Sequence, residues 1–327
     1  MAKIKYRDAI KAAIAEEMRK DKDIFIIGED IAKGYEGCFG VTTDLVKEFG
    51  TERIIDTPIS EASIIGAAMG ASMLGIKTIA EIMFEDFITV GFDGIVNQAA
   101  KLKTMSGGQY NLNMVVRTPG GAGGLGVQHS QCLESVFMHF PGLYIAIPSN
   151  AYDAKGLLKK AINYGNPVIF FEHQRLYNIE SEIPEEEYYI DFGKANIIKE
   201  GSDLTMVAFS YMIKVSQEAI EVLEKKHNIS IELIDPRTLV PLDYGTITDS
   251  VKKTNKLVIV EEGVLRAGVG SEIASEINEK CFDYLDYPVR RIASKNYLVP
   301  LNPKMSKSIV PNKERIIKEV EELFFSK

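Results

Sequence analysis

Short, almost wholly apolar runs recur along the first half of the chain, with stretches of helical spacing between them. The runs cover residues 23–30, 77–84, 113–118, 143–148 and 167–172. A strand that is apolar on both faces is buried on both, which is typical of a parallel sheet covered by helices on each side. The pattern therefore predicts an α/β fold built on a parallel sheet.

The intervening stretches carry helical patterns. Ile10, Ile14 and Met18 repeat every four residues and predict an amphipathic helix after Asp8. Residues 53–75 predict a strand, a turn and then a helix of small residues. Further helices are expected over 91–105 and 151–163.

An acidic, proline-containing segment, NIESEIPEEEYYIDFG at 178–193, interrupts this rhythm. Its composition is typical of a solvated surface loop and is compatible with a domain linker. Beyond it, strands are expected at 203–210, 229–235, 256–263 and 287–293, with helices from Tyr211 and near 269–280. We therefore place a boundary near Gly193 and expect two α/β domains, 1–185 and 190–327, which suits a chain of 327 residues.

Composition excludes several classes of protein. The net charge of −8 argues against nucleic acid as the main partner. Cys38, Cys132 and Cys281 form no CxxC pair, which favours a reducing compartment over a disulfide framework. The charged N-terminal stretch lacks the apolar core of a signal peptide, and no run of about 18 apolar residues predicts a membrane span. A cytoplasmic enzyme or enzyme subunit is expected.

Residues 121–126 spell GAGGLG, which matches the GxGxxG pattern and follows a predicted strand. A dinucleotide site also needs an acidic residue about twenty positions later, at the end of the next strand. That strand ends in IAIPS and offers no carboxylate. We therefore favour a close-packed loop that presents His129 over an NAD site.

Glu61 begins a helix directly after Pro58, Ile59 and Ser60. A carboxylate in the first helical turn can simply complement the helix dipole. This helix is almost wholly apolar, however, and its glycines at Gly66 and Gly70 allow another backbone to approach closely. A carboxyl group entering such surroundings could serve in proton transfer. The four histidines lack the spacing of a zinc site.

Several strings occur in an order and spacing that resemble the β subunits of heterotetrameric 2-oxo acid dehydrogenases, of the pyruvate, branched-chain and acetoin type. They are RIIDTPISEASIIGAAMGAS, MSGGQ, GVQHSQCLESVFMHFPGL, PSNAYDAKGLLKKAI, NPVIFFEH, IELIDPRTLVPLD and VIVEEGVLRAGVGSEIASEI. The resemblance covers essentially the whole chain. It implies a pyrimidine-type thiamine diphosphate-binding domain followed by a transketolase C-terminal-like domain.

The resemblance also implies residue roles. Glu61 matches the glutamate that hydrogen-bonds the aminopyrimidine ring of thiamine diphosphate and supports proton transfer there. Phe87 matches an aromatic residue that packs on that ring, with Met83 and Ile59 as neighbours. His129 matches the histidine that assists substrate positioning and acyl transfer to lipoamide. The implied reaction is oxidative decarboxylation of a 2-oxo acid and reductive acylation of a lipoyl group, whose disulfide is the acceptor.

Half of the cofactor site is missing from the sequence. Related chains hold Mg2+ and diphosphate through a GDG sequence and a later Asn pair, but the nearest string here is FDG at 92–94. The family's α subunit supplies that half, so an α2β2 assembly with a β–β contact is implied, active only when both subunits are present. The C-terminal domain resembles the part that docks on the dihydrolipoyl acyltransferase core.

Family members also bind a structural potassium ion through main-chain carbonyl groups. The matching positions are Met114, Ala161, Ile162, Tyr164 and Asn166. An Asp is frequent in the family where Tyr164 stands, so this chain departs from the pattern there. Potassium binding is an expectation from the resemblance alone.

Alternative functions remain open. Pyruvate is the leading substrate, with acetoin or branched-chain 2-oxo acids as alternatives, because the residues that would decide belong to the α subunit. A split transketolase or deoxyxylulose-phosphate synthase half would keep the fold, but the HSQ and MSGGQ strings favour the dehydrogenase. A flavoprotein-like binding module without catalysis, or a purely structural paralogue, would give Glu61 no chemical role.

Overall fold

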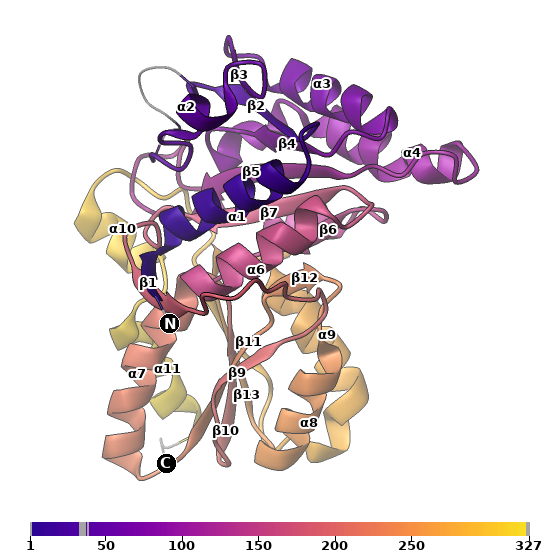
Figure 1. The fold of residues 1–327 in the computed structure, drawn as a ribbon. Helices are drawn as coiled ribbons and strands as arrows, with labels where there is room; N and C mark the ends of the chain where they lie inside the picture. Colours follow the sequence, from indigo (N-terminus) through magenta and orange to yellow (C-terminus); the bar gives the residue numbers. More distant parts are fainter. Residues whose placement is uncertain (1, 33–36, 38, 325–327) are drawn as a thin grey trace. The chain divides into compact units, whose positions relative to one another are not determined.

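The computed structural model describes residues 2–32, 37 and 39–324, and it divides into two compact units. The first comprises Met1–Gly120 and Val136–Phe192, and the second comprises Gly121–Ser135 and Gly193–Lys327. Each unit is a sheet with helices packed on it (Figure 1). The α/β class predicted from the apolar runs is therefore confirmed.

The first unit contains a parallel sheet in the order β6-β7-β5-β4-β2-β3. Its strands are β2 (Phe25–Glu29), β3 (Ile54–Thr57), β4 (Thr78–Glu81), β5 (Met114–Gly120), β6 (Tyr144–Ala146) and β7 (Val168–His173). All residues of β4, β5 and β7 are buried, as expected for strands covered on both faces.

Helices cover both faces of this sheet. Helices α1 (Tyr6–Lys20) and α6 (Ala151–Ile162) pack on each other on one side, and α3 (Glu61–Met73) lies on the other (Figure 1). The helix predicted over 91–105 is a π-helical segment, η2 (Gly94–Ala99), continued by α4 (Ala100–Met105). Short helices α2 (Leu45–Phe49) and α5 (Glu134–Met138) and the 3-10 turn η1 (Glu85–Thr89) complete the set.

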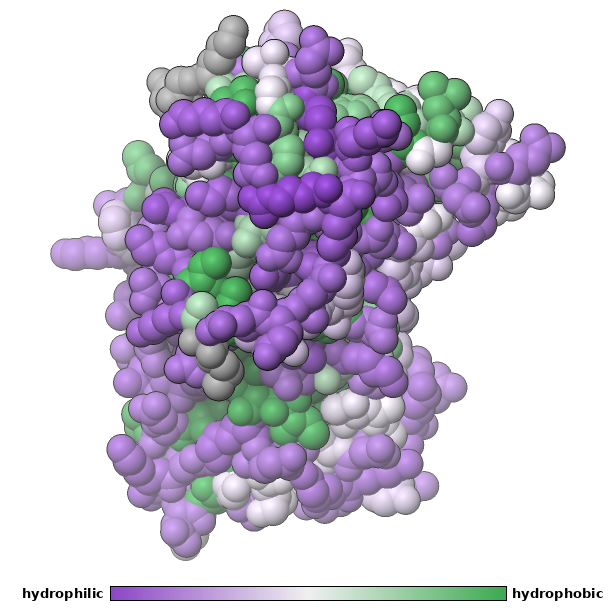
Figure 2. All heavy atoms as spheres, viewed as in Figure 1, coloured by the Kyte–Doolittle hydropathy of each residue, from purple (hydrophilic) through white to green (hydrophobic). Residues whose placement is uncertain are grey.

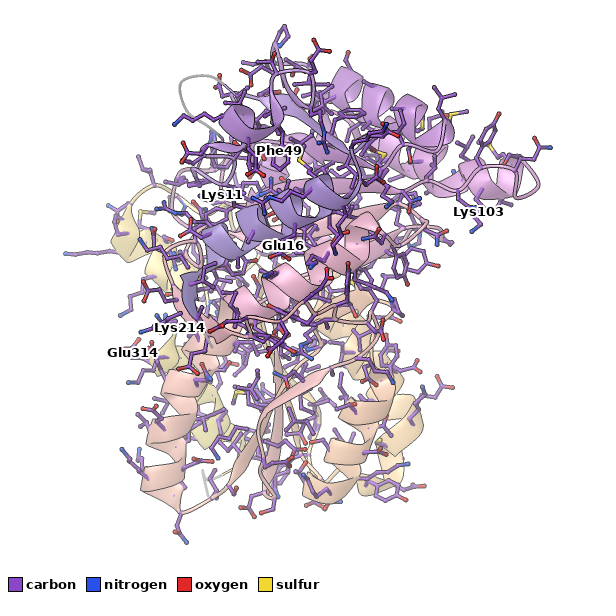
Figure 3. All side chains as sticks on the ribbon, in the orientation of Figure 1. Lys11, Glu16, Phe49, Lys103, Lys214 and Glu314 are labelled. Atoms are coloured by element: carbon purple, nitrogen blue, oxygen red, sulfur yellow. The ribbon has the colours of Figure 1, made fainter. Side chains whose placement is uncertain are left out.

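Charged groups join α1 to α6. Glu16 projects from α1 toward α6 (Figure 3), where its carboxylate oxygens lie 2.7 Å from Lys155 Nζ and 2.7 Å from Lys159 Nζ. Lys159 is fully buried and also lies 2.7 Å from a carboxylate oxygen of Glu187. Hydrophilic residues cover the outer side of α1 (Figure 2). The buried lysine is thus neutralised from two distant parts of the chain.

The segment 178–193 is more ordered than a solvated loop. Residues Glu180–Ile183 form β8, which pairs antiparallel with β1 (Ala2–Lys5). Ile183 and Ile190 are buried. The acidic composition hid this role because the apolar residues that anchor the segment are few and widely spaced.

The second unit contains a sheet in the order β14-β13-β10-β11-β9. Its strands are β9 (Asn196–Lys199), β10 (Leu204–Ala208), β11 (Ile231–Asp235), β13 (Leu257–Val264) and β14 (Arg290–Ser294), and the short β12 (Thr238–Val240) also belongs to this unit. Strand β9 pairs antiparallel with β11, whereas the remaining pairs in this sheet are parallel. An antiparallel edge on a parallel sheet is common in α/β domains.

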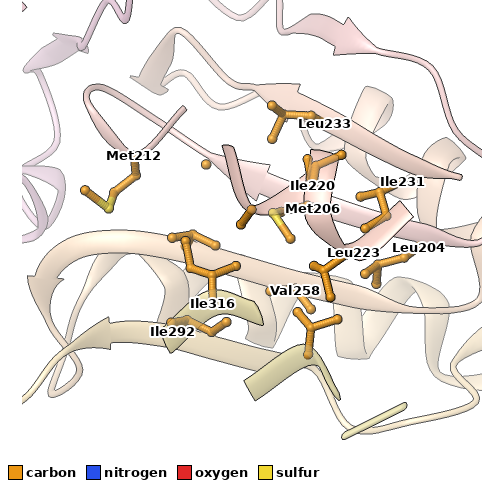
Figure 4. Close-up of a cluster of buried hydrophobic side chains, with 14 of the residues drawn as sticks. Leu204, Met206, Met212, Ile220, Leu223, Ile231, Leu233, Val258, Ile292 and Ile316 are labelled. Carbon is orange, nitrogen blue, oxygen red and sulfur yellow. The ribbon is translucent and has the colours of Figure 1, made fainter. Parts of the chain in front are cut away.

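Helices α7 (Met212–His227) and α11 (Lys313–Phe324) pack on one face of this sheet, and α8 (Tyr244–Thr254) and α9 (Val269–Cys281) on the other (Figure 1). Figure 4 shows the core between α7, α11 and the strands, where Ile220, Leu223 and Ile316 meet Met206 and Val258. The remaining elements are η3 (Phe282–Tyr284) and α10 (Pro303–Ile309).

Residues Gly121–Ser135 belong to the second unit, although the sequence analysis placed them inside a first domain of 1–185. Ala122 packs with Val299, Ile309 and Val310 in a small buried cluster, which ties this loop to the C-terminal region. The second division between the units lies at Gly193.

No helix in the described ranges is long and apolar enough to cross a membrane. Among the described residues, Cys132 and Cys281 form no disulfide, and Cys38 lies outside the described residues. The cytoplasmic location expected from the sequence stays a prediction.

Candidate active site

The carboxyl ends of the parallel strands in the first unit bring polar side chains to one edge of the sheet. Glu29 is the last residue of β2, and Glu61 begins α3 shortly after β3 ends at Thr57. Met83 and Phe87 follow the end of β4 at Glu81. Because β2 lies between β3 and β4, these residues come from three neighbouring strand ends. This edge is where α/β sheets bind ligands.

Glu61 is only 7% exposed, and a second buried carboxyl group, Glu29, stands beside its helix. The Ser60 backbone N–H donates to Glu29 Oε1 at 3.3 Å, directly before Glu61. Burial raises the pKa of Glu29, and the negative charge of Glu61 raises it further. These surroundings favour the protonated form of Glu29, and a carboxyl group that can hold a proton beside Glu61 suits a proton-transfer site.

The turn that carries Phe87 packs so closely against α3 and β5 that two glycines at these contacts have no space for a side chain. A Cβ on Gly91, just after η1, would lie 2.8 Å from Ile65 Cγ1 and 3.4 Å from the Glu61 carbonyl oxygen. A Cβ on Gly120, at the end of β5, would lie 1.8 Å from Glu85 Oε2. Gly91 therefore allows the segment after η1 to approach the first turn of α3, and Gly120 allows Glu85 of η1 to lie against β5. Phe87 and Glu61 thus share one region of the edge.

Apolar groups stand uncovered beside Glu61. Ile59, two residues before the buried Glu61, is 82% exposed. The outward face of α3 is also exposed and consists of Ala62, Ser63, Gly66, Ala67 and Gly70. Figure 2 shows hydrophobic residues reaching the surface over this helix.

A fully buried ion network below this edge was missed by the sequence analysis. Arg117, in the middle of β5, is 1% exposed and forms a bidentate pair with Glu172, Nε to Oε1 at 2.7 Å and Nη2 to Oε2 at 2.9 Å. Its Nη1 also bonds Glu81, and the Tyr177 hydroxyl donates to Glu172 Oε2 at 2.6 Å. An arginine inside the apolar run MVVRT signals such a network, because a buried charge needs partners.

The charges of this network are set by burial and by each other. Burial alone would lower the pKa of Arg117, but Glu172 and Glu81 raise it above its ordinary value, so the guanidinium stays a cation. Burial raises the pKa of Glu81, against the effect of Arg117. Burial and the neighbouring Glu172 also raise the pKa of Tyr177, which keeps its hydroxyl protonated as a donor.

His129 lies in the second unit, on the glycine-rich loop after β5. It is half-buried, and its backbone N–H donates to the Gly126 carbonyl at 3.1 Å. The buried Ser130 hydroxyl accepts from the Leu125 N–H at 3.2 Å. No helix follows GAGGLG directly, since α5 begins only at Glu134. The loop thus lacks the helix N-terminus that a dinucleotide pyrophosphate requires.

The second unit also buries carboxyl groups that the sequence analysis did not single out. Burial raises the pKa of Glu134 to about 8, with the charges of Glu261 and Glu262 adding to the effect. Burial raises the pKa of Glu261 to about 7, although Glu261 Oε1 accepts from the Gly270 N–H at 3.1 Å at the start of α9. In the described ranges, no group of three or more His, Cys, Asp or Glu side chains is placed to hold a metal ion.

The five positions matched to a potassium site come together at the opposite edge of the first unit's sheet. Met114 begins β5, Ala161 and Ile162 end α6, and Tyr164 and Asn166 lie in the turn before β7. The Gly165 N–H donates to Asn113 Oδ1 at 2.7 Å, which joins this turn to the start of β5. The Ala161 carbonyl already accepts the Tyr164 N–H at 3.2 Å.

Comparison with known proteins identifies both parts of the chain. Residues 2–180 match the transketolase pyrimidine binding domain, and residues 193–316 match the transketolase C-terminal domain. The chain is 42% identical over 332 residues to the acetoin:2,6-dichlorophenolindophenol oxidoreductase subunit beta of Bacillus subtilis (98% of this chain, 97% of that one). It is 43% identical over 323 residues to the pyruvate dehydrogenase E1 component subunit beta of Rickettsia felis (98% of each chain).

The chain belongs to the 2-oxo acid dehydrogenase β-subunit family. Among solved structures, a split gene transketolase described as an inactive beta4 tetramer matches with a TM-score of 0.79 at 21% identity, covering 98% of each chain. That likeness supports the transketolase-type fold. The resemblance inferred from the sequence strings is confirmed.

Membership in this β-subunit family does not by itself assign the site residues. The structure places Ile59, Glu61, Met83 and Phe87 at one edge of the first unit, whereas His129 belongs to the second unit. Glu29 and Arg117 join the candidate residues from the structure. Glu29 could have been found from the sequence, because it ends a wholly apolar strand with the acidic pair Glu29 and Asp30.

Proposed function

We propose that this chain is the β subunit of a thiamine diphosphate-dependent 2-oxo acid dehydrogenase that acts on pyruvate. It works together with an α subunit, decarboxylates the 2-oxo acid oxidatively and transfers the acyl group to a lipoyl group. The observation that carries this proposal is Glu61, a buried carboxyl group at the start of an apolar helix with a second buried carboxyl group, Glu29, beside it.

The residues at this edge suit the aminopyrimidine end of thiamine diphosphate. When bound, the cofactor supplies the nucleophilic carbon that attacks the 2-oxo group and the ring that accepts the electrons released with CO2. Glu61 holds a proton at the aminopyrimidine ring, and the neighbouring Glu29 keeps that proton available in a site of low polarity. Half-buried Phe87 and Met83 and exposed Ile59 provide apolar cover for a flat ring.

The diphosphate and its Mg2+ require a partner chain, because this sequence lacks the GDG string and the Asn pair. The exposed face of α3 supports such a partner. A Cβ on Gly66 or Gly70 would meet no atom of this chain within 4 Å, so a second backbone can approach closely there. We assign this face to the α subunit, in an α2β2 assembly with a β–β contact that docks on an acyltransferase core.

His129 takes the role of positioning the substrate and assisting acyl transfer, as its match to the family histidine implies. It is half-buried on a loop that the second unit anchors through Ala122. Potassium binds the main-chain carbonyls of Met114, Ala161, Ile162, Tyr164 and Asn166. The convergence of these positions at one sheet edge supports it, and the existing hydrogen bond to the Ala161 carbonyl weakens it.

Acetoin is the second candidate substrate. The Bacillus subtilis subunit named for acetoin matches at 42% identity and the Rickettsia felis subunit named for pyruvate dehydrogenase at 43%. Such similar identities do not separate the two substrates. Residues of the α subunit decide between them, since this chain contributes only part of the site.

The test is turnover by the chain co-expressed with its α subunit, with thiamine diphosphate and Mg2+ present. Pyruvate, 2-oxoisovalerate and acetoin are offered separately with an artificial electron acceptor, and this chain alone is the control. We expect cofactor-dependent turnover of pyruvate only by the assembled pair. Turnover by the lone chain would overturn the half-site assignment, and turnover of acetoin alone would replace the substrate.

A further inference from the structure

A run of aromatic rings connects the buried ion network of the first unit to Phe87. The Tyr177 ring lies 5.1 Å from that of Phe39, measured between centroids and tilted by 34°. Phe39 meets Phe84 edge to face at 5.8 Å, and Phe84 meets Phe87 in the same way at 5.9 Å. Each spacing lies within the range in which aromatic pairs attract and orient one another.

The Tyr177 end of this run is held rigidly. Its hydroxyl donates to Glu172 Oε2 at 2.6 Å, and Glu172 is in turn paired on both oxygens with Arg117. On its other side, the Tyr177 ring meets Tyr6 of α1 edge to face at 5.9 Å. A buried charge network with good geometry resists displacement, so Tyr177 provides a fixed base for the rings that follow.

The Phe87 end faces the cofactor edge and is less constrained by backbone structure. Phe87 is half-buried on the 3-10 turn η1, whose hydrogen bonds span few residues. The neighbouring rings therefore contribute to the orientation of Phe87. Phe39 lies between β2 and α2 and contacts both Tyr177 and Phe84, so it joins the two ends of this run.

We propose that Phe39 is a positioning residue for thiamine diphosphate: through Phe84 it holds Phe87 at the angle at which the Phe87 ring packs on the aminopyrimidine. This inference rests on the proposed function. It assigns Phe39 no contact with substrate or with reacting atoms. It follows that Phe39 acts on the affinity for the cofactor and not on the chemical step.

The test is Phe39→Leu in the assembled α–β complex, with thiamine diphosphate affinity measured by calorimetry and by the cofactor dependence of turnover. Losing one edge-to-face and one tilted contact raises the Kd of thiamine diphosphate by about three- to tenfold. The kcat at saturating cofactor and the KM for pyruvate stay unchanged. A general loss of structure would instead lower kcat or alter the KM for pyruvate.

A double-mutant cycle shows whether Phe39 acts through Phe87. In a Phe87→Leu background, Phe39→Leu adds no further loss of cofactor affinity, because the ring that it orients is gone. Phe137→Leu is the matched control. Phe137 is fully buried in a separate aromatic cluster with Phe92 and Phe171, so its substitution lowers thermal stability but leaves cofactor affinity unchanged.

An unchanged Kd in a folded Phe39→Leu complex overturns the proposal, as does an equal loss in the Phe87→Leu background. If Phe39→Leu does not assemble, Phe84→Leu breaks the next contact of the run and decides by the same criteria. A wild-type complex that binds no thiamine diphosphate means that the proposed function itself has failed. If the wild-type and Phe39→Leu complexes bind thiamine diphosphate equally tightly, only the positioning role has failed.

Discussion

Replacing Arg117 by Met removes the only cation that the structure pairs with Glu81 and Glu172 in the described part of the first unit. The aliphatic side chain fills much of the same space, so the change isolates the charge. Both carboxyl groups then stay buried without their cation. Removing one partner of a buried ion pair costs about 3–5 kcal/mol, because the remaining charge is uncompensated.

The variant can limit this cost by taking up a proton. At pH 7, protonating a carboxyl group whose ordinary pKa is about 4.3 costs about 1.4 kcal/mol for each unit between the pH and the pKa. The total is about 3–4 kcal/mol. For a domain of this size, such a loss lowers Tm by about 6–16 °C. In the folded variant the pKa of the buried carboxyl group is raised. The loss of stability therefore shrinks as the pH falls toward the ordinary pKa of a carboxyl group.

Arg19→Met is the matched control. Arg19 also forms a bidentate pair, with Glu48 at 2.6 and 2.8 Å, but its side chain is 55% exposed. Exposed pairs contribute about 0–1 kcal/mol, so Tm changes by at most about 4 °C. Thermal unfolding of both variants followed by circular dichroism from pH 5.5 to 8 compares them. A loss in Arg117→Met no larger than in Arg19→Met, or one that does not vary with pH, would refute the reasoning.

Three further predictions concern other residues. Gly120→Ala would place a Cβ 1.8 Å from Glu85 Oε2, so we expect a loss of about 1–3 kcal/mol of stability in thermal unfolding and weaker thiamine diphosphate binding in calorimetry. Gly66→Ala should leave the lone chain as stable or stabilise it by up to about 1 kcal/mol, yet reduce co-purification of the α subunit; undiminished assembly would contradict the docking face. Glu134 has its pKa raised to about 8 from 4.5, so its contribution to stability is full below about pH 4.5 and lost as the pH rises through 8; Glu134→Gln should flatten Tm across that window.

Much of the fold could be predicted from local pattern. Runs such as 77–84 and 167–172 are apolar on both faces and correspond to strands in the structure, β4 at Thr78–Glu81 and β7 at Val168–His173. The pairing of β1 with β8 could not be predicted, because it joins residues nearly 180 positions apart through backbone hydrogen bonds that no side-chain pattern records. The same holds for the loop 121–135, whose place depends on Ala122 meeting three residues near the C-terminus.

The candidate site divides in the same way. Glu61 could be singled out because a carboxyl group at the start of an apolar helix is a local feature. The partners of Arg117 could not, since Glu81 and Glu172 lie 36 and 55 positions away and are brought to it by strand order. The aromatic run from Tyr177 to Phe87 likewise exists only after folding, because Phe39 lies far in sequence from both ends.

The most direct test of the account measures whether Glu61 governs the proton chemistry of the bound cofactor. Exchange of the reactive thiazolium proton of thiamine diphosphate for deuterium is followed by NMR in the assembled α–β complex, for the wild type and for Glu61→Gln. We predict that Glu61→Gln still binds the cofactor but loses about 10²- to 10⁴-fold of the exchange rate. Equal exchange rates in the two complexes, with the cofactor fully bound in both, would contradict the central claim.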